Sequence, residues 1–169
     1  RAERAPDRIN RMPMTESYPY LEALTSPDDI RAMPVTTLDG LAADIRRRLI
    51  SLCMTRSAHF ASNLGIVELT IALHSVFDFK SDRLIFDVGH QVYPHKLITG
   101  RLKPFETIRM KDGLSGYPEP DESVYDPFRT GHASSSLSSA LGLAVGLREK
   151  SPDARDRKST RLNSSHRIR

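Results

Sequence analysis

A short apolar run that ends in polar and glycine residues constrains the fold of this chain more than any other feature. Residues 84–100, LIFDVGHQVYPHKLITG, begin with apolar side chains and continue into an acid, a glycine, two histidines and a lysine. An apolar run without polar alternation is typical of a strand in a parallel sheet that is buried on both faces. In such sheets the binding crevice lies beyond the carboxyl ends of the strands. The stretch therefore predicts an α/β domain with a site at the end of the Leu84–Val88 strand.

Helical patterns surround this strand. Apolar residues recur at helical spacing in two long segments. The first is expected to start at a capping-box-like pair, Thr36 and Asp39, and the second to be capped by Ser62 or Asn63. Two long helices are predicted at 37–54 and 62–77, two short ones at 93–100 and 103–110, and one rich in Ala, Gly and Leu at 134–150. Arginines 46–48 of the first helix are expected to form a solvated face, and His74 of the second is expected to be a structural histidine and not a ligand.

Residues 111–131 connect the last two of these helices and hold three prolines and three glycines without periodicity. They predict a loop, and loops of this length in compact domains are usually functional. Only one strand is predicted, which is too few for a finished sheet. The expected fold is therefore an α/β layer domain with an incomplete sheet.

The formal net charge of +4 is located at the two ends of the chain. Residues 1–13 carry +2 and residues 156–169 carry +4, so residues 14–155 are left with −2. This distribution leaves one alternative open, namely that the chain is a non-enzymatic module that binds nucleic acid through its basic ends. The acidic balance of the body argues against it, because such proteins usually carry a basic patch on the folded domain. We expect no nucleic-acid partner.

Both ends also look foreign to the domain. The chain does not begin with Met, and Met14 opens a plausible start, so residues 1–13 are expected to be a non-native upstream extension. Residues 156–166, DRKSTRLNSSH, match the translation of a widely used sequencing adapter. We therefore expect the partial domain to span residues 14–155. Residues 156–169 are predicted to be an adapter-derived, disordered tail, because they offer few apolar side chains against five positive charges.

The single cysteine, Cys53, excludes an internal disulfide framework and fits a reducing compartment. No apolar run approaches the roughly 18 residues that a membrane span needs. A cytoplasmic protein without a membrane partner is the expectation.

Three histidines lie in Gly-, Ser- or Ala-rich turns next to predicted helix starts: His59, His90 and His132. Backbone N–H groups and the helix dipole favour anions at such positions, and imidazoles can move protons near neutral pH. The pattern is compatible with a phosphorylated ligand, and equally with capping and core histidines. A zinc-binding structural domain is a weaker alternative, because His90 and His95 match no recognised zinc spacing.

Four stretches resemble the 1-deoxy-D-xylulose-5-phosphate synthase family, which are transketolase-like thiamine diphosphate enzymes. They are HFASNLGIVELTIALHSVFD, LIFDVGHQVYPHKLITGR, TIRMKDGLSGYPEPDESVYD and GHASSSLSSALGLAVG, in the family's order and spacing. The resemblance covers about residues 17–150, at the family's N-terminal end. It implies an α/β fold, namely the incomplete N-terminal part of a thiamine-diphosphate-binding doubly wound parallel-sheet domain.

The resemblance also implies roles for individual residues. His90 matches a residue that contacts thiamine diphosphate, and Gly131, His132 and Ala133 match the family's cofactor segment. Ala133 replaces the commoner Ser, so only its backbone is expected to take part. His59 matches an active-site histidine near the reacting carbon. Residues 111–126 of the loop correspond to a segment that is often mobile near the active site.

The implied reaction condenses pyruvate with glyceraldehyde 3-phosphate and releases carbon dioxide, for isoprenoid, thiamine and pyridoxal precursors. The family's magnesium ligands, including the Asp of a Gly-Asp-Gly motif, lie downstream of the matched stretch, so no metal ligand is expected here. A homodimer is expected for the full-length protein and inactivity for this chain. The alternative, an N-terminal subunit of a split transketolase-like enzyme, requires a Gly-Asp-Gly motif that this chain does not contain.

Overall fold

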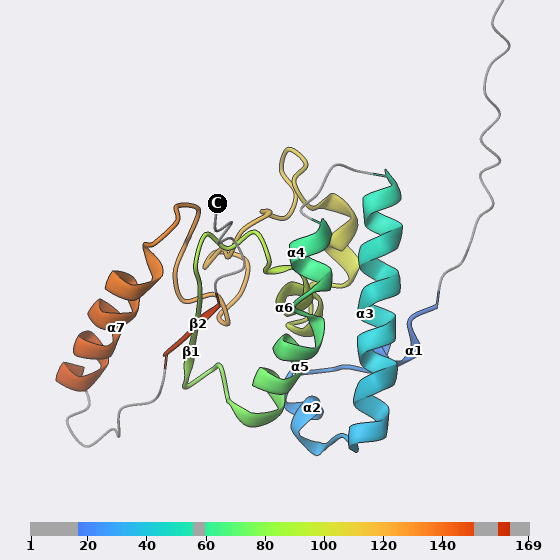
Figure 1. Cartoon of the computed structure of the whole chain (residues 1–169), viewed down its shortest axis with the longest axis horizontal. Helices are drawn as coiled ribbons and strands as arrows, with labels where there is room; N and C mark the ends of the chain where they lie inside the picture. Colours follow the sequence, from blue (N-terminus) through green and yellow to red (C-terminus); the bar gives the residue numbers. More distant parts are fainter. Residues whose placement is uncertain (1–16, 56–59, 151–158, 163–169) are drawn as a thin grey trace, which may run out of the picture.

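The computed structural model describes residues 17–55, 60–150 and 159–162, in which helices predominate (Figure 1). The elements before the first strand are α1 (Pro19–Glu22), α2 (Asp28–Ala32), α3 (Val35–Thr55), α4 (Phe60–Leu64) and α5 (Val67–Val76). They are followed by β1 (Arg83–Phe86), α6 (Tyr93–Ile98), the 3-10 helix η1 (Lys103–Thr107), α7 (Ser136–Lys150) and β2 (Ser159–Leu162).

Helix α3 is the longest of these elements and forms one side of the core. Its apolar stripe of Leu41, Ile45, Leu49 and Leu52 is buried against α1, α4 and α5. The predicted helix is confirmed, but its predicted cap is wrong. The helix begins at Val35, where the carbonyl of Pro34 already accepts hydrogen bonds from the next turn, so Thr36 lies inside it.

The arginines 46–48 on α3 were expected to form a solvated face, and for Arg48 that expectation is wrong. Its side chain is 6% exposed and donates to Glu106 Oε1 at 2.6 Å. The guanidinium also lies 5.3 Å from the ring centre of Phe105. The positive charge of Arg48 is thus stabilised inside the protein by the Phe105 ring and the Glu106 carboxylate, and not by solvent.

The predicted 62–77 helix is two helices, α4 and α5, separated by a turn at Gly65 and Ile66. Neither Ser62 nor Asn63 is a cap, because both lie inside α4. The expectation that His74 is a structural histidine is confirmed: the residue is buried together with Val67 and Ile71 of the same stripe.

Strand β1 pairs in parallel with β2, with Arg83 opposite Ser159 and Phe86 opposite Leu162. Helix α7 lies between the two strands in sequence, as a crossover connection in a parallel sheet requires. The predicted α/β class with an incomplete sheet is confirmed. Residues 159–162 of the tail that is predicted to be disordered form β2, and the rest of 156–169 lies outside the described residues. Ladder bonds are made by backbone groups, so an open strand edge accepts an extended segment of almost any sequence.

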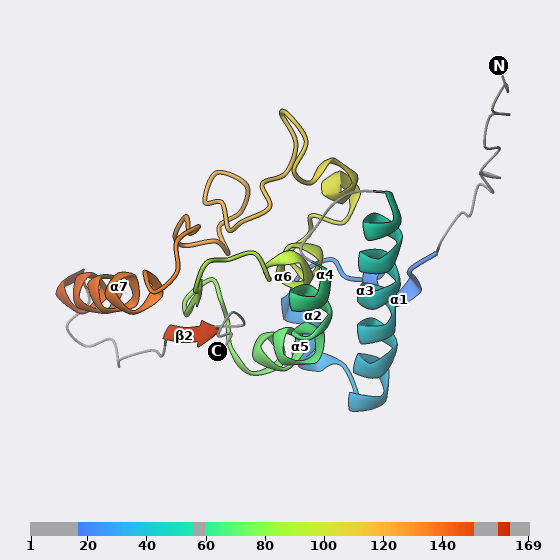
Figure 2. The same ribbon diagram turned by 45° about the horizontal axis from the view of Figure 1, so that its top comes forward.

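Helix α7 lies across the strands from the cluster of α2 to α6 (Figures 1 and 2). Among residues 136–149 of α7, only Ser136 is buried, while Leu137 and Leu141 are 60% and 67% exposed. A helix this apolar normally buries one face. Among the described residues, no element covers the apolar side chains of this helix. Within the described residues, no helix combines the length and the apolar character that crossing a membrane requires.

Candidate functional site

The turn that follows β1 has a backbone conformation that requires glycine. Val88 and Gly89 both have positive φ, 64° and 95°, and the Gly89 N–H donates to the Asp87 carbonyl at 2.7 Å. A Cβ on Gly89 would lie 2.3 Å from Thr130 Oγ1 and 2.5 Å from Pro118 Cδ. Two parts of the 111–131 loop therefore pack directly against this turn, and only glycine leaves room for them.

Asn63 connects the same turn to the helices on either side of it. Its side-chain amide donates to the His90 carbonyl at 2.8 Å, and its Oδ1 accepts from the Tyr93 N–H at 2.9 Å. Asn63 is 1% exposed, so both bonds are shielded from water. Sequence reasoning missed this role. The sequence did contain a signal for it: Asn63 is an amide side chain in a mostly apolar helical segment, and such a polar residue needs a hydrogen-bond partner when that segment is buried.

The N-terminus of α7 approaches the turn from the other side. The Ser136 N–H donates to Asp87 Oδ1 at 3.4 Å. Ser136 Oγ and Thr130 Oγ1 are buried, and neither has a hydrogen-bond partner within the part of the chain that the structure describes. A buried hydroxyl normally finds a partner, so these two groups are candidate hydrogen-bond donors for a ligand at this turn.

The structure brings two of the three predicted histidine segments together. Contact between Gly89 and Thr130 places the turn that carries His90 beside the segment that starts at Gly131. His90 is half-buried, whereas Gly131, His132 and Ala133 are exposed. A Cβ on Gly131 would meet nothing within 4 Å, so the space in front of this segment is open. His59 lies outside the described residues, and its role stays a prediction.

Two other histidines form a separate, buried pair. His74 Nε2 lies 3.0 Å from His95 Nδ1, and His95 Nε2 lies 3.1 Å from Asp126 Oδ1. Burial lowers the pKa of both imidazoles, that of His74 well below its ordinary value. His95, although it lies in the same motif as His90, therefore faces the protein interior and not the site.

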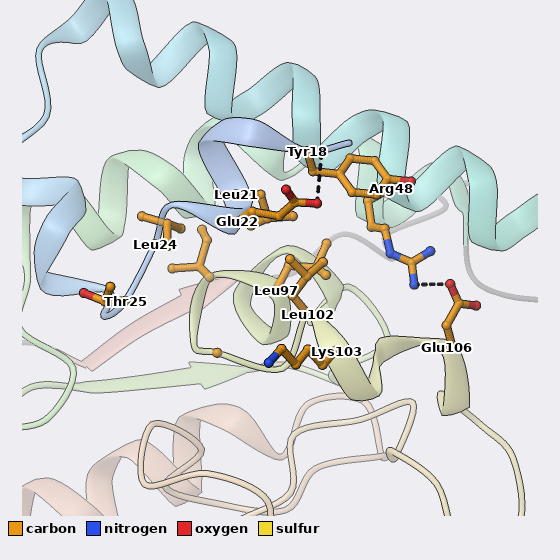
Figure 3. Close-up of a pocket in the computed structure, with 12 residues that line it drawn as sticks. Tyr18, Leu21, Glu22, Leu24, Thr25, Arg48, Leu97, Leu102, Lys103 and Glu106 are labelled. Atoms are coloured by element: carbon orange, nitrogen blue, oxygen red, sulfur yellow. Dashed lines mark hydrogen bonds and ion pairs between the residues drawn. The ribbon is translucent and has the colours of Figure 1, made fainter. Parts of the chain in front are cut away.

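Figure 3 shows the cavity between α1, α3, α6 and η1, which has a volume of about 630 Å³. Its lining includes the apolar side chains of Leu21, Leu97 and Leu102 and the exposed charged side chains of Lys103 and Glu106. None of the predicted site residues lines it. Its charges are of both signs, which gives it no preference for an anionic ligand.

No group of three or more His, Cys, Asp or Glu side chains suited to a metal ion occurs among the described residues. Magnesium needs several oxygen ligands in a near-octahedral arrangement. The described part of the chain thus offers hydroxyls, backbone N–H groups and imidazoles to a ligand, but no metal centre.

Comparison with known proteins identifies the relatives of this domain. A sequence model of the 1-deoxy-D-xylulose-5-phosphate synthase family matches residues 21–157. The 1-deoxy-D-xylulose-5-phosphate synthases of Rhodopirellula baltica and Chromobacterium violaceum are 56% and 51% identical to the chain over 131 residues. Each match covers 78% of this chain and 21% of the relative. That of Thioalkalivibrio sulfidiphilus is 49% identical over 142 residues, 84% of the chain and 22% of the relative. The chain thus spans about one fifth of the length of these relatives.

Proposed function

Because the chain belongs to the 1-deoxy-D-xylulose-5-phosphate synthase family, we propose that it forms one wall of a thiamine diphosphate site. The observation that carries the proposal is the contact between the Gly89 turn and Thr130, with two buried hydroxyls beside it that lack partners in the described part of the chain. This arrangement fits the diphosphate end of the cofactor, which presents several acceptor oxygens and negative charge.

Each group at this edge has a role in the proposal. The hydroxyls of Thr130 and Ser136 and the first N–H groups of α7 donate hydrogen bonds to phosphate oxygens, and the helix dipole adds a favourable potential. Gly131 leaves room for the ligand to approach the backbone. His90, His132 and the backbone of Ala133 complete the contact surface, and His59 acts near the reacting carbon as a proton carrier.

Asp87 has a supporting role, because its carboxylate accepts from the Ser136 N–H and fixes the start of α7 against the strand. Thiamine diphosphate, when bound, supplies the electron sink for the loss of carbon dioxide from a 2-oxo acid. The protein groups bind and orient this cofactor and hold hydrogen-bond donors toward the oxygens that gain charge.

For the full-length protein, the proposal comprises the condensation of pyruvate with glyceraldehyde 3-phosphate, a magnesium ion held by residues outside the described ones, a homodimer and a cytoplasmic location. The chain itself is proposed to lack synthase activity. Magnesium neutralises much of the diphosphate charge in such sites, and the groups at this edge contribute only about 0.3–1 kcal/mol each through the helix dipole. Binding by this chain is therefore expected to be weak.

A titration followed by ¹H–¹⁵N correlation spectra tests the proposal with the chain as it is. Millimolar thiamine diphosphate with magnesium should shift the amides of residues 89–91 and 131–136. Thiamine without its diphosphate should shift them much less. Ser136→Ala should weaken the response without loss of stability, because the hydroxyl that it removes has no described partner. Ser138→Ala, which removes an exposed hydroxyl of the same helix, serves as the control.

Shifts confined to the cavity of Figure 3, or equal shifts with thiamine and thiamine diphosphate, contradict the assignment of the cofactor to the end of β1. Saturable micromolar binding contradicts a different part of the proposal, namely that groups outside the described residues supply most of the affinity.

A further inference from the structure

The long loop before α7 is attached to α6 and the residues just after it by buried ion pairs. Figure 2 shows the segment, coloured yellow to orange, between η1 and α7. Lys96 pairs with Glu122, and Arg101 donates two hydrogen bonds to Asp126, at 2.6 and 3.0 Å. The side chain of Lys96 is fully buried, and those of Arg101 and Asp126 are 6% and 1% exposed. This is unusual, because loops normally run over the surface with solvated charges.

The charges in this cluster are balanced. Two cations, Lys96 and Arg101, face two carboxylates, Glu122 and Asp126, and Arg101 also lies 3.4 Å from Glu122. His95 adds a hydrogen bond to Asp126 without adding charge, because burial favours its neutral form. Removing one charge from such a cluster leaves its partner buried and unpaired, which costs far more than the loss of a surface pair.

The same two carboxylates also fold the loop on itself. Glu122 Oε1 accepts from the Ser115 N–H at 2.6 Å, and Asp126 Oδ2 accepts from the Glu119 N–H at 2.9 Å. These bonds fix the chain on both sides of Pro118. Pro118 and Thr130 are the residues that pack against Gly89, so the position of the loop is transmitted to the turn that carries His90.

We propose that Lys96 and Arg101 are positioning residues. By pairing with Glu122 and Asp126, they hold the 111–131 loop against the Gly89 turn and so determine where Gly131 and His132 lie at the end of β1. In this proposal the segment, for which the family resemblance implies mobility, is held at its centre by these pairs. The positioning role stands on these contacts alone. Only the identity of the ligand that the positioned segment binds rests on the proposed function.

Hydrogen exchange of the 169-residue chain, followed by mass spectrometry without any ligand, tests this role. Glu122→Gln keeps an oxygen that can accept from Ser115 and removes the charge that balances Lys96. We expect exchange to increase about tenfold or more in residues 113–126 and 131–136, with exchange of residues 41–52 in α3 unchanged. The double variant Lys96→Met with Glu122→Gln removes both charges and should restore most of the protection, which a purely steric effect of Gln would not do.

Glu106→Gln is the matched control, because it removes the partner of another buried cation, Arg48, away from the loop. It should leave exchange of the loop unchanged. Unchanged loop exchange in Glu122→Gln overturns the proposal. So does an increase of equal size in α3, which indicates general destabilisation instead of release of the loop.

A second measurement needs no variant and decides the question if Glu122→Gln does not fold. Exchange of the unaltered chain is compared in low salt and in about 1 M NaCl, which screens exposed charges over a few ångströms. Loop exchange should change less than twofold if the buried pairs hold the loop. A large increase shows that the exposed pairs of Arg129 with Glu119 and Asp121 hold it, and overturns the proposal. Because no cofactor is present, failure here is independent of whether the site binds thiamine diphosphate.

Discussion

His74 and His95 form a hydrogen bond of 3.0 Å between ring nitrogens in the interior of the protein, where each residue is 1% exposed. At least one ring must be neutral for one nitrogen to accept, and burial lowers the pKa of both. Asp126 accepts from the far nitrogen of His95 at 3.1 Å, which fixes the tautomer of that ring. The neutral pair therefore links α5 to α6, and the bond from His95 to Asp126 links α6 to the loop before α7.

We predict that acidification below pH 6.5 destabilises the fold through this pair. Both pKa values are lowered on folding, so the unfolded chain binds more protons below the ordinary histidine pKa of 6.5. Stability is fully present above that pH and is lost as pH falls, with a limiting slope of about 1.4 kcal/mol per pH unit for each histidine. The lowered pKa of Asp126 adds a further loss only in more acidic solution, below its ordinary value of 3.8.

Urea unfolding at several pH values between 7.5 and 5 measures this dependence. His74→Gln should flatten it, whereas His132→Gln, at an exposed position, should leave it unchanged. A pH profile that is the same in the His74 variant assigns the effect to other groups.

Gly89→Ala is predicted to destabilise the protein by roughly 2–5 kcal/mol. Two effects contribute to this cost. A residue with a Cβ is strained at the φ of 95° that Gly89 has, and the new methyl group would lie 2.3 Å from Thr130 Oγ1. Gly142→Ala is the matched control, since a Cβ there meets nothing within 4 Å and the residue lies inside α7. It should stabilise the helix by about 0.5–1 kcal/mol. Thermal unfolding of both variants compares the two glycines, and equal effects contradict the packing of the loop on the turn.

Asn63→Ala is predicted to cost about 2–3 kcal/mol, because it removes two buried hydrogen bonds, to the His90 carbonyl and from the Tyr93 N–H. The amides of residues 90–93 should lose protection in hydrogen exchange. Ser75→Ala, which removes an exposed hydroxyl bonded to the Ala72 carbonyl, should cost less than about 0.5 kcal/mol. A loss in Asn63→Ala no greater than in this control shows that Asn63 does not hold the turn.

Leu141→Gln on α7 is predicted to reduce self-association without changing the free energy of unfolding by more than about 0.5 kcal/mol. Leu137, Leu141 and Val145 form an exposed stripe at helical spacing, and such apolar patches promote association. Val124→Gln provides the comparison, because Val124 is 79% exposed but lies in the loop, outside this stripe. Sedimentation velocity at several concentrations distinguishes the two. Identical behaviour of both variants indicates that α7 is not the associating surface.

The sequence by itself determined the family of this protein and the segments that form α3, β1, α6 and α7. The apolar run before Asp87 identified β1, and the spacing of Leu41, Ile45 and Leu49 identified α3. Both patterns depend on side chains within a few residues of one another, and their period alone separates strand from helix. The glycines and prolines of 111–131 likewise indicated a segment without regular structure, as the structure has it.

Only the tertiary structure decided which of these segments meet and which polar groups become buried. Asn63 bonds to residues 27 and 30 positions away, and Arg48 reaches Glu106 across 58 positions. Basic residues such as Lys96 and Arg101 normally lie at the surface. Here both are buried, because the loop supplies a carboxylate to each. Pairing of β2 with β1 likewise depends on an open edge and not on side-chain pattern. Burial of a charge depends on a partner distant in sequence, so no local pattern contains that information.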